Sequence, residues 1–380
     1  MNSLVLASLK HFRGLHALVI AGIAVAVAVL AGALLVGSSV RASLRDLALA
    51  RLGATELVLS STGFFRAALA DDLRRSSDLN GGAVMASTPM LALTGAVTHE
   101  GSRRTAARVQ VFGIEDRFLA FHGRSGAAPT DRQAWMSPGL AAELGAEADD
   151  TLLLRIAKPT DIPLSNLQGR REDASERVRL TVTRIVPRDE LGEFSLAPAQ
   201  GPVLSIFVAL SRLQQDLDLQ QTVNAVLVRM TSPASDPQAD VATIQRGVRP
   251  ALQFEDLGLT RRSTPDQKVT ILEHRTGLLP EAIESSINGA AVRAKMPTVG
   301  ALTYLATSIR ARGREIPYSL ITAIDLEAHD RLRGGTPASQ PLVTMSAVPA
   351  QGASALPPIR LNEWAAKDLG TVPADRGEID

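Results

Sequence analysis

Few residue patterns in this chain resemble catalytic, metal-binding or nucleotide-binding motifs, and each lacks a residue that the motif requires. No Gly-x-x-x-x-Gly-Lys-Ser/Thr loop is present, so the sequence predicts no ATP binding by that route. The histidines form neither a His-Glu-x-x-His motif nor an i,i+4 pair, which indicates solvated surface residues rather than a zinc site. They are His11, His16, His99, His122, His274 and His329. We expect no metal and no cofactor.

One serine and three carboxylate pairs are the remaining candidates. Ser125 lies between His122 and Gly126 in HGRSG, which is not the Gly-x-Ser-x-Gly pattern of a strand-to-helix elbow. The paired carboxylates are adjacent in sequence and therefore point to different faces of a helix or strand, which makes them poor acid–base pairs. They are Asp71/Asp72, Glu115/Asp116 and Asp149/Asp150. The sequence thus predicts no catalytic residue and a protein that is not an enzyme.

Composition narrows the class of protein further. The chain has 380 residues, a net charge of +1 and no cysteine, which excludes disulfides and thiolate chemistry. The balanced charge argues against a nucleic-acid partner. Aromatic residues make up only 3%, so we expect cores built from Leu, Val, Ile and Ala and no aromatic binding platform.

The dominant feature is an apolar segment near the N-terminus. Residues 14–40 contain no Asp, Glu, Lys or Arg, and about 20 helical residues suffice to cross a bilayer. The apolar core of a signal peptide is shorter, about 7–15 residues. This length favours a retained transmembrane helix. The small residues at 31–33 keep signal-peptide cleavage open as the alternative.

Flanking charge leaves the orientation of this helix nearly balanced. Lys10 and Arg13 precede it, and Arg41, Arg45 and Arg51 follow it. Because long domains translocate largely regardless of charge, the long segment after the helix favours a cytoplasmic N-terminus and a single-pass protein with its bulk outside the membrane. Residues 1–13 are then a cytoplasmic or interfacial segment.

Two finer patterns accompany the helix. Small residues spaced four apart form a stripe that lets another membrane helix approach closely, although such residues are also simply common in membrane helices. They are Ala24, Ala28 and Gly32. Residues 41–53 keep helical spacing, with Leu44, Leu47 and Ala48 along one side and Gly53 as the C-cap. We therefore expect a helical stalk.

Strand and helix patterns alternate after residue 54, which predicts an α+β protein whose exterior part has two α/β modules. The prolines of TSPASDPQ break the chain, so we place one module at 54–232 and the other at 233–380. GPVLSIFVALS is too short to span a membrane and predicts a buried strand leading into a helix. FFRAALADDLRR predicts an amphipathic helix.

The second module repeats the first. LNEWAAKDLGTVPAD echoes MSPGLAAELGAEADD, and TYLATSIRARGREIPYSLITAIDLEA echoes ALTGAVTHEGSRRTAARVQVFGIEDRF. Chance similarity in an Ala- and Leu-rich chain is the alternative explanation. The strand TLLLRI that follows the first copy has no counterpart in the second, so we expect the second module to be incomplete.

These segments together resemble the N-terminal part of an FtsX/MacB-type ABC transporter permease. The resemblance rests on the basic flank, membrane helix and stalk, on MSPGLAAELGAEADDTLLLRI, and on LSIFVALSRLQQDLDLQQTVNAVLVRM. It implies a periplasmic core domain with mixed sheets, location in the bacterial inner membrane, and a cytoplasmic ATPase subunit whose motion is transmitted outward. The handled substrate would be a lipoprotein, a peptide or an amphiphile.

This chain departs from the family in one important respect. The family has four membrane helices and only the first is present here, so further permease helices or a second copy would complete the unit. Two other classes stay open. One is a single-pass anchored binding protein without a transport role and with a ligand cleft between the modules. The other is a secreted enzyme whose mature N-terminus lies near Ser38.

Overall fold

The computed structural model describes most of the chain, which folds into two compact units, Met1–Leu259 and Thr260–Asp380. Each unit is described by itself. The predicted module boundaries at 54–232 and 233–380 remain predictions. The described residues are 7–8, 10–76, 83–157, 175–198, 201–234, 236–265, 269–311, 313–325, 343–345 and 359–370.

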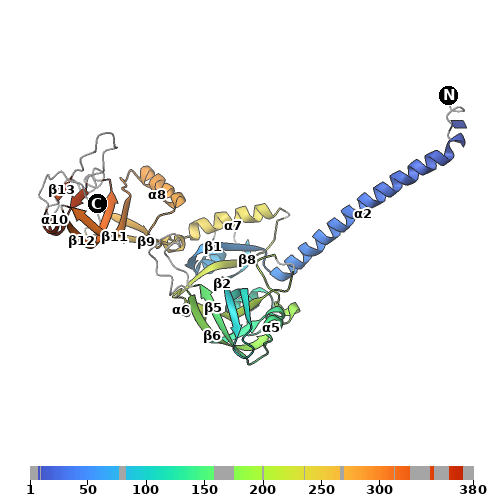
Figure 1. Ribbon diagram of the computed structural model, residues 1–380, viewed down its shortest axis with the longest axis horizontal. Helices are drawn as coiled ribbons and strands as arrows, with labels where there is room; N and C mark the ends of the chain where they lie inside the picture. Colours follow the sequence, from blue (N-terminus) through green and yellow to red (C-terminus); the bar gives the residue numbers. More distant parts are fainter. Residues whose placement is uncertain are drawn as a thin grey trace. The chain divides into compact units, whose positions relative to one another are not determined.

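The first unit begins with one long helix, α2 (Arg13–Leu52), which contains both the predicted transmembrane segment and almost all of the predicted stalk. Figure 1 shows it as a single unbroken helix. Its 40 residues span about 60 Å at 1.5 Å per residue. Gly53 is the C-cap, as predicted, and its φ of 59° and ψ of −125° lie outside the range that other residues adopt readily.

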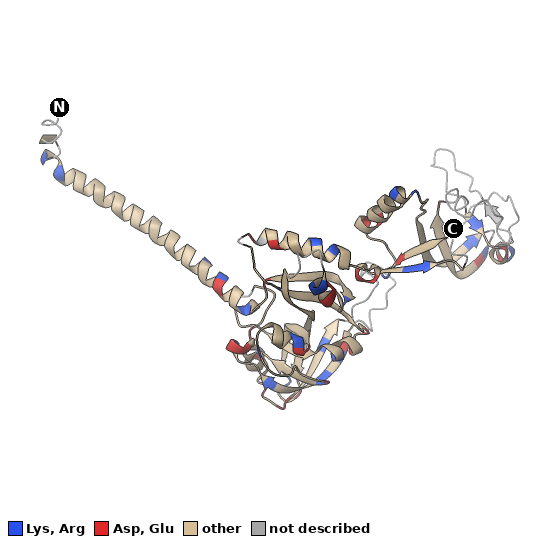
Figure 2. Cartoon of the chain, turned by 180° about the vertical axis from the view of Figure 1, so that it is seen from behind, with Lys and Arg blue, Asp and Glu red and all other residues tan. Residues whose placement is uncertain are grey.

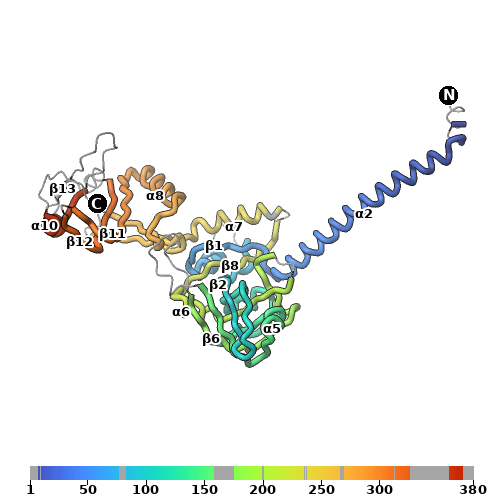
Figure 3. The backbone as a smooth tube through the Cα atoms, in the orientation of Figure 1, coloured from blue at the N-terminus to red at the C-terminus, as the bar shows by residue number. Residues whose placement is uncertain are grey.

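An eight-stranded mixed sheet forms the rest of the architecture, and part of it closes on itself. Its order is β1-β8-β2-β3-β7-β4-β6-β5, and β2 also pairs with β5. The strands from β2 to β5 therefore close into a six-stranded barrel. Figure 3 shows three of them, β2, β5 and β6, beside one another. The strands are β1 (Leu57–Arg66), β2 (Val84–His99), β3 (Thr105–Ile114), β4 (Gln133–Met136), β5 (Thr151–Ala157), β6 (Ser175–Ile185), β7 (Ser205–Ala209) and β8 (Thr222–Met230).

Strand β2 belongs to two structures at once. Its first half pairs with β8, and its second half pairs with β3 and β5 inside the barrel. Sixteen residues are long for a strand, and this length is what lets β2 connect the β1–β8 ribbon to the barrel.

The core has two parts with different chemistry. The larger cluster is aliphatic apart from Phe65, as composition predicted, and combines the barrel interior with residues of β1, β8, α3, α5, α6 and α7. The second cluster is aromatic, which composition did not predict. Its phenylalanines are Phe112, Phe118, Phe121, Phe194 and Phe207. Five of the chain's nine phenylalanines thus gather at one place, so a low aromatic content did not mean an even spread.

Short helices connect the strands. They are α3 (Leu69–Arg75), α4 (Asp116–Phe121), α5 (Pro138–Leu144), α6 (Leu210–Asp216) and α7 (Pro237–Ala251), with 3-10 turns η3 (Arg188–Glu190) and η4 (Phe254–Leu257). The predicted strand-to-helix segment is confirmed as the fully buried β7 followed by α6. The helix predicted over FFRAALADDLRR is wrong at its start, because Phe64–Arg66 continue β1 in its ladder with β8.

Ser137 connects α5 to β7 through its buried hydroxyl. Its Oγ accepts hydrogen bonds from the N–H groups of Leu140 and Ser205, both at 3.1 Å, and donates to the carbonyl of Val203 at 2.7 Å. It is therefore the N-cap of α5 and a bridge to the neighbouring strand.

Ser137→Ala is expected to lower the free energy of unfolding by about 2 kcal/mol, because it leaves two buried N–H groups without a partner. Urea denaturation followed by tryptophan fluorescence measures this, in a Trp364→Phe background that leaves Trp135 as the single reporter. Asp236→Ala removes the exposed N-cap of α7 and serves as control, with an expected loss below about 1 kcal/mol. Equal losses would contradict the bridging role.

Among its described residues, the second unit contains three strand pairs and two helices. Strand β9 (Leu259–Ser263) pairs with β10 (Thr270–His274), and β11 (Ala301–Ala311) pairs antiparallel with β12 (Arg314–Ile324). Strands β13 (Val343–Met345) and β14 (Ile359–Leu361) pair antiparallel. The helices are α8 (Glu281–Ala294) and α10 (Glu363–Leu369). A small core joins β11, β12, β14 and α10.

Candidate functional site: the membrane helix and its junction

The apolar surface of α2 lies open along its length. Among the described residues it is the one helix long and apolar enough to cross a membrane. Leu18, Val29 and Leu35 are each about two-thirds or more exposed, and Figure 2 shows no charged residue between the two ends of the helix. A soluble protein rarely exposes a contiguous apolar surface of this size, so this surface needs lipid or another helix around it.

The site residues predicted from sequence all lie on this helix. The stripe of Ala24, Ala28 and Gly32 is exposed, and a Cβ added at Gly32 would meet no atom within 4 Å. Leu44 and Leu47 are 39% and 37% exposed, and Ala48 is half-buried. The packing role of the first set and the stalk role of the second remain predictions.

The last turn of α2 is fastened to the folded body through Arg51, which is only 7% exposed. Its guanidinium bonds Glu193 at 3.1 Å and the carbonyl of Gly201 at 2.9 Å, while its own carbonyl accepts from the N–H of Ser195 at 3.3 Å. A buried arginine with a carboxylate and a carbonyl partner is a strong local constraint. The helix end and the 193–201 segment are thereby held together.

A second contact follows immediately after the helix. The N–H of Ala54 donates to Nδ1 of His122 at 3.0 Å. At Gly53, an added Cβ would lie 2.6 Å from the same Nδ1, so this close approach requires glycine. Arg51, Gly53, Ala54, His122 and Glu193 are called the junction below.

His122 is held neutral at the junction. Burial, and secondarily the positive charges of Arg124 and Arg229, lower the pKa of His122 to about 4. The ring packs edge-on against Phe118, Phe121 and Phe194, with centroids 4.6 to 5.4 Å away. Since Nδ1 accepts from Ala54, the proton of the neutral ring is on Nε2, which is buried without a partner among the described residues.

Acidification is therefore expected to weaken the fold through His122. The folded chain binds this proton near pH 4 and the unfolded chain near 6.5, so the unfolded state holds more protons between these values. The free energy of unfolding should fall by about 3 kcal/mol from pH 6.5 to pH 4 through this group.

Comparison with His122→Asn isolates this contribution, because Oδ1 of asparagine accepts the same bond without titrating. The difference in the free energy of unfolding between the two proteins, measured in two urea-denaturation series, should change progressively as the pH falls from 6.5 to about 4, because only the histidine titrates. Parallel series would show that His122 is not the group responsible.

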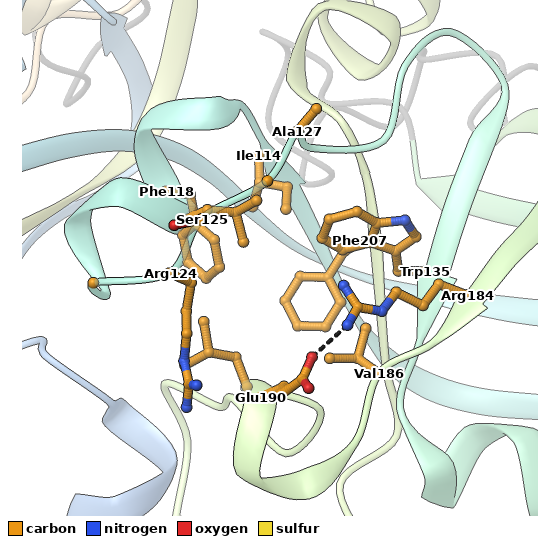
Figure 4. Close-up of a pocket in the computed structure, with 14 residues that line it drawn as sticks. Ile114, Phe118, Arg124, Ser125, Ala127, Trp135, Arg184, Val186, Glu190 and Phe207 are labelled. Carbon is orange, nitrogen blue, oxygen red and sulfur yellow. Dashed lines mark hydrogen bonds and ion pairs between the residues drawn. The ribbon is translucent and has the colours of Figure 1, made fainter.

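A cavity of about 420 Å³ lies on the other side of the aromatic cluster (Figure 4). Phe118 and Phe207 form part of its wall together with Trp135, and Arg184 lies over the Trp135 ring at 5.5 Å while pairing with Glu190. Ser125 also lines it. The lining combines apolar side chains with two arginines, Arg124 and Arg184, and one carboxylate, Glu190. This excess of one positive charge suits an amphiphile with an anionic group.

The other candidates from the sequence are placed as follows. Histidines 99 and 122 are not solvated as predicted: His99 is 6% exposed and bonds Ser102, and His122 lies at the junction. Their burial left no signal in the sequence because neither lies in a motif. Among described residues, no group of three or more His, Asp or Glu could hold a metal.

The first carboxylate pair diverges, as predicted. Asp71 pairs with Arg74 and Arg117, whereas Asp72 pairs with Arg66 and Arg75. Each of these two carboxylates therefore binds its own arginines rather than its neighbour.

Comparison with known proteins gives limited likenesses. No protein-family model and no curated protein sequence matches the chain. The periplasmic region of MacB from Actinobacillus actinomycetemcomitans aligns at 9% identity with a TM-score of 0.31, covering 61% of this chain and 91% of that one. The extracellular domain of the ABC-type transporter YknZ from Gram-positive bacteria aligns at 10% identity with a TM-score of 0.27, covering 49% and 88%. At these TM-scores neither likeness assigns a function.

Proposed function

We propose that this chain is a membrane-anchored permease subunit of an ABC transporter, or the N-terminal part of one, that transmits motion from a cytoplasmic ATPase to an extracytoplasmic domain. One observation carries the proposal: the charge-free segment 14–40 belongs to a helix that continues without a break to a last turn whose arginine, Arg51, is buried in the folded body. Motion of the membrane segment would reach the body through this path.

The contacts at the junction are the kind that transmit displacement. The Arg51–Glu193 pair and the Ala54–His122 bond connect the helix end to two separate segments of the body. A flexible linker would instead absorb a movement of the helix. The helix and the folded body would therefore move together as one rigid lever. The extracytoplasmic domain would act on a lipoprotein, a peptide or an amphiphile.

The proposal places the chain in the bacterial inner membrane, with its N-terminus in the cytoplasm. Its partners would be a cytoplasmic ATPase subunit, further permease helices or a second copy, and membrane lipid. Since the chain has no cysteine, a single Asp46→Cys residue in the stalk reports orientation. A membrane-impermeant maleimide should label it in intact spheroplasts. A Ser8→Cys residue should react only after lysis.

Affinity purification from membranes tests the partnership. The full chain should recover an ATPase subunit, and a chain whose residues 14–40 are replaced by an unrelated single-pass helix should recover much less. Recovery of neither an ATPase nor a permease partner would overturn the transporter role. N-terminal sequencing of the mature protein tests the anchor, because a start near Ser38 would mean that the helix is removed.

A single-pass binding protein is the second candidate, and the cavity beside Trp135 favours it. That cavity lies entirely within the first unit. Binding of an anionic amphiphile should quench Trp135 fluorescence in the Trp364→Phe background. Binding with no ATPase requirement in cells would favour this candidate over the permease.

A further inference from the structure

The barrel of the first unit consists of two similar halves. Each half is a hairpin followed by a short strand and a short helix: β2-β3-β4-α5 and β5-β6-β7-α6. The second strand of each half pairs in parallel with the third strand of the other half: β3 with β7, and β6 with β4. Antiparallel β2–β5 and β4–β7 ladders join the halves. The barrel therefore has an approximate twofold axis.

The second unit contains one such half. Residues Arg104 and Arg314 each lie 3.3 Å from the Cβ position of a left-handed glycine, Gly145 and Gly370 respectively, that ends the half's helix. Four residues after each arginine comes a non-glycine residue with positive φ, at 55° in β3 and 51° in β12. Two unusual features in the same relative places identify β11-β12-β14-α10 as a β2-β3-β4-α5 half.

The buried side chains agree position by position. The first half buries Val97, Ala106, Met136, Ala141 and Leu144. The second unit buries Ile309, Ile316, Leu361, Ala366 and Leu369 at the corresponding places. The internal repeat predicted from sequence is thus matched by the packing.

Among the described residues of the second unit, no second strand lies beside β11. In the barrel the outer edge of β2 is covered by β5, but within the described residues β11 pairs with β12 alone. The interior face is correspondingly open. Leu302 and Tyr304 are 43% and 47% exposed, whereas Leu91, the counterpart of Leu302, is completely buried.

We propose that a second copy of this chain covers that edge, with its β11 antiparallel to the first. The choice of occupant follows from the barrel. We call the first strand of each half, β2 or β5, a β2-type strand, and in the barrel these two strands pair with each other. The expected neighbour of β11, the first strand of its half, is therefore another β2-type strand. In the part of the chain that the structure describes, β11 is the strand of this type with an open edge. A twofold axis makes such an interface self-complementary.

The barrel also sets the register. Val97 lies opposite Leu154 at the axis, and both side chains are completely buried. The corresponding residue of β11 is Ile309, which therefore opposes Ile309 of the second copy. Ser308 then opposes Arg310, so no like charges face each other across the ladder.

The absence of cysteine makes the test direct. Opposed residues in an antiparallel ladder have Cα atoms about 4.5–5.5 Å apart, within reach of a disulfide. Mild oxidation of the full-length Ile309→Cys chain in detergent should give a covalent dimer, although Ile309 is only 5% exposed. Leu320→Cys on β12 is 74% exposed but lies at least three strand spacings from its copy, so it should stay monomeric.

If cross-linking came from random collision, the more exposed Leu320→Cys would give more covalent dimer than Ile309→Cys. A second variant guards against misfolding of Ile309→Cys: chains carrying Ser308→Cys and Arg310→Cys should cross-link when co-expressed and not when expressed alone. The proposal is overturned if the chain dimerises, for example through α2 alone, but neither Ile309→Cys nor the Ser308→Cys and Arg310→Cys pair cross-links. Cross-linking at Leu320→Cys equal to that at Ile309→Cys would also overturn it. The inference is independent of the transporter role.

Discussion

Replacing Arg51 by alanine is expected to lower the free energy of unfolding of the first unit by about 3–5 kcal/mol, the usual cost of breaking a buried ion pair from one side. The guanidinium bonds Glu193 and the carbonyl of Gly201 in a place with little solvent access. Without it, the 14%-exposed Glu193 loses its buried partner. Urea denaturation of the detergent-solubilised chain, reported by Trp135, measures the change.

The chain offers a matched control in Arg188, which pairs with the same Glu193 at 3.0 Å but is 72% exposed. Arg188→Ala should cost less than about 1 kcal/mol, because water screens an exposed pair. The proposed lever adds a functional expectation: Arg51→Ala should also weaken the coupling of ATP hydrolysis to the exterior domain. If both variants behave alike, the burial of Arg51 has no special role.

The second large effect is expected for Arg66→Ala, again about 3–5 kcal/mol. Arg66 ends β1 and binds Asp256 of η4 through three side-chain bonds, the shortest 2.7 Å long. The Asp256 side chain is fully inaccessible to solvent. The substitution leaves this carboxylate with backbone N–H partners alone, from Arg66 and Gln253, and removes the tie between η4 and the β1 edge.

Arg75→Ala is the comparison for this site. Arg75 and Arg66 both bind Asp72 at 3.1 Å, but Arg75 is 70% exposed, so its loss should be worth less than about 1 kcal/mol. A double variant, Arg66→Ala with Asp256→Ala, should recover part of the stability because no buried charge is then left unpaired. Failure of that recovery would indicate that packing of the arginine stem matters more than its charge.

Sequence alone reached the features that are local in the chain. The charge-free run at 14–40, the Gly53 helix end, and the buried strand before α6 each follow from residue types within one window. The helix of the internal repeat was also visible, because Ala141, Leu144 and Gly145 keep the same register as Ala366, Leu369 and Gly370. These predictions rest on periodicity and on glycine conformations, which short segments encode.

The junction and the closed barrel could not be reached this way. Arg51 and Glu193 are 142 residues apart, and nothing in either neighbourhood singles out a buried pair among 79 charged residues. His122 was predicted to be solvated. Its burial could not be predicted, because it depends on contacts with Phe194 and Ala54, which are distant in the sequence. Low aromatic content likewise said nothing of where the phenylalanines gather.

The pairing of β1 with β8 has a consequence for biogenesis. Leu57 lies opposite Val228, so the first strand after the membrane helix finds its neighbour only about 170 residues later in the chain. At synthesis speeds of about 5–20 residues per second, that interval lasts on the order of ten seconds or more. In the membrane orientation proposed above, β1 would therefore leave the membrane before its neighbour β8 has been synthesised, and its edge would stay unpaired during that interval.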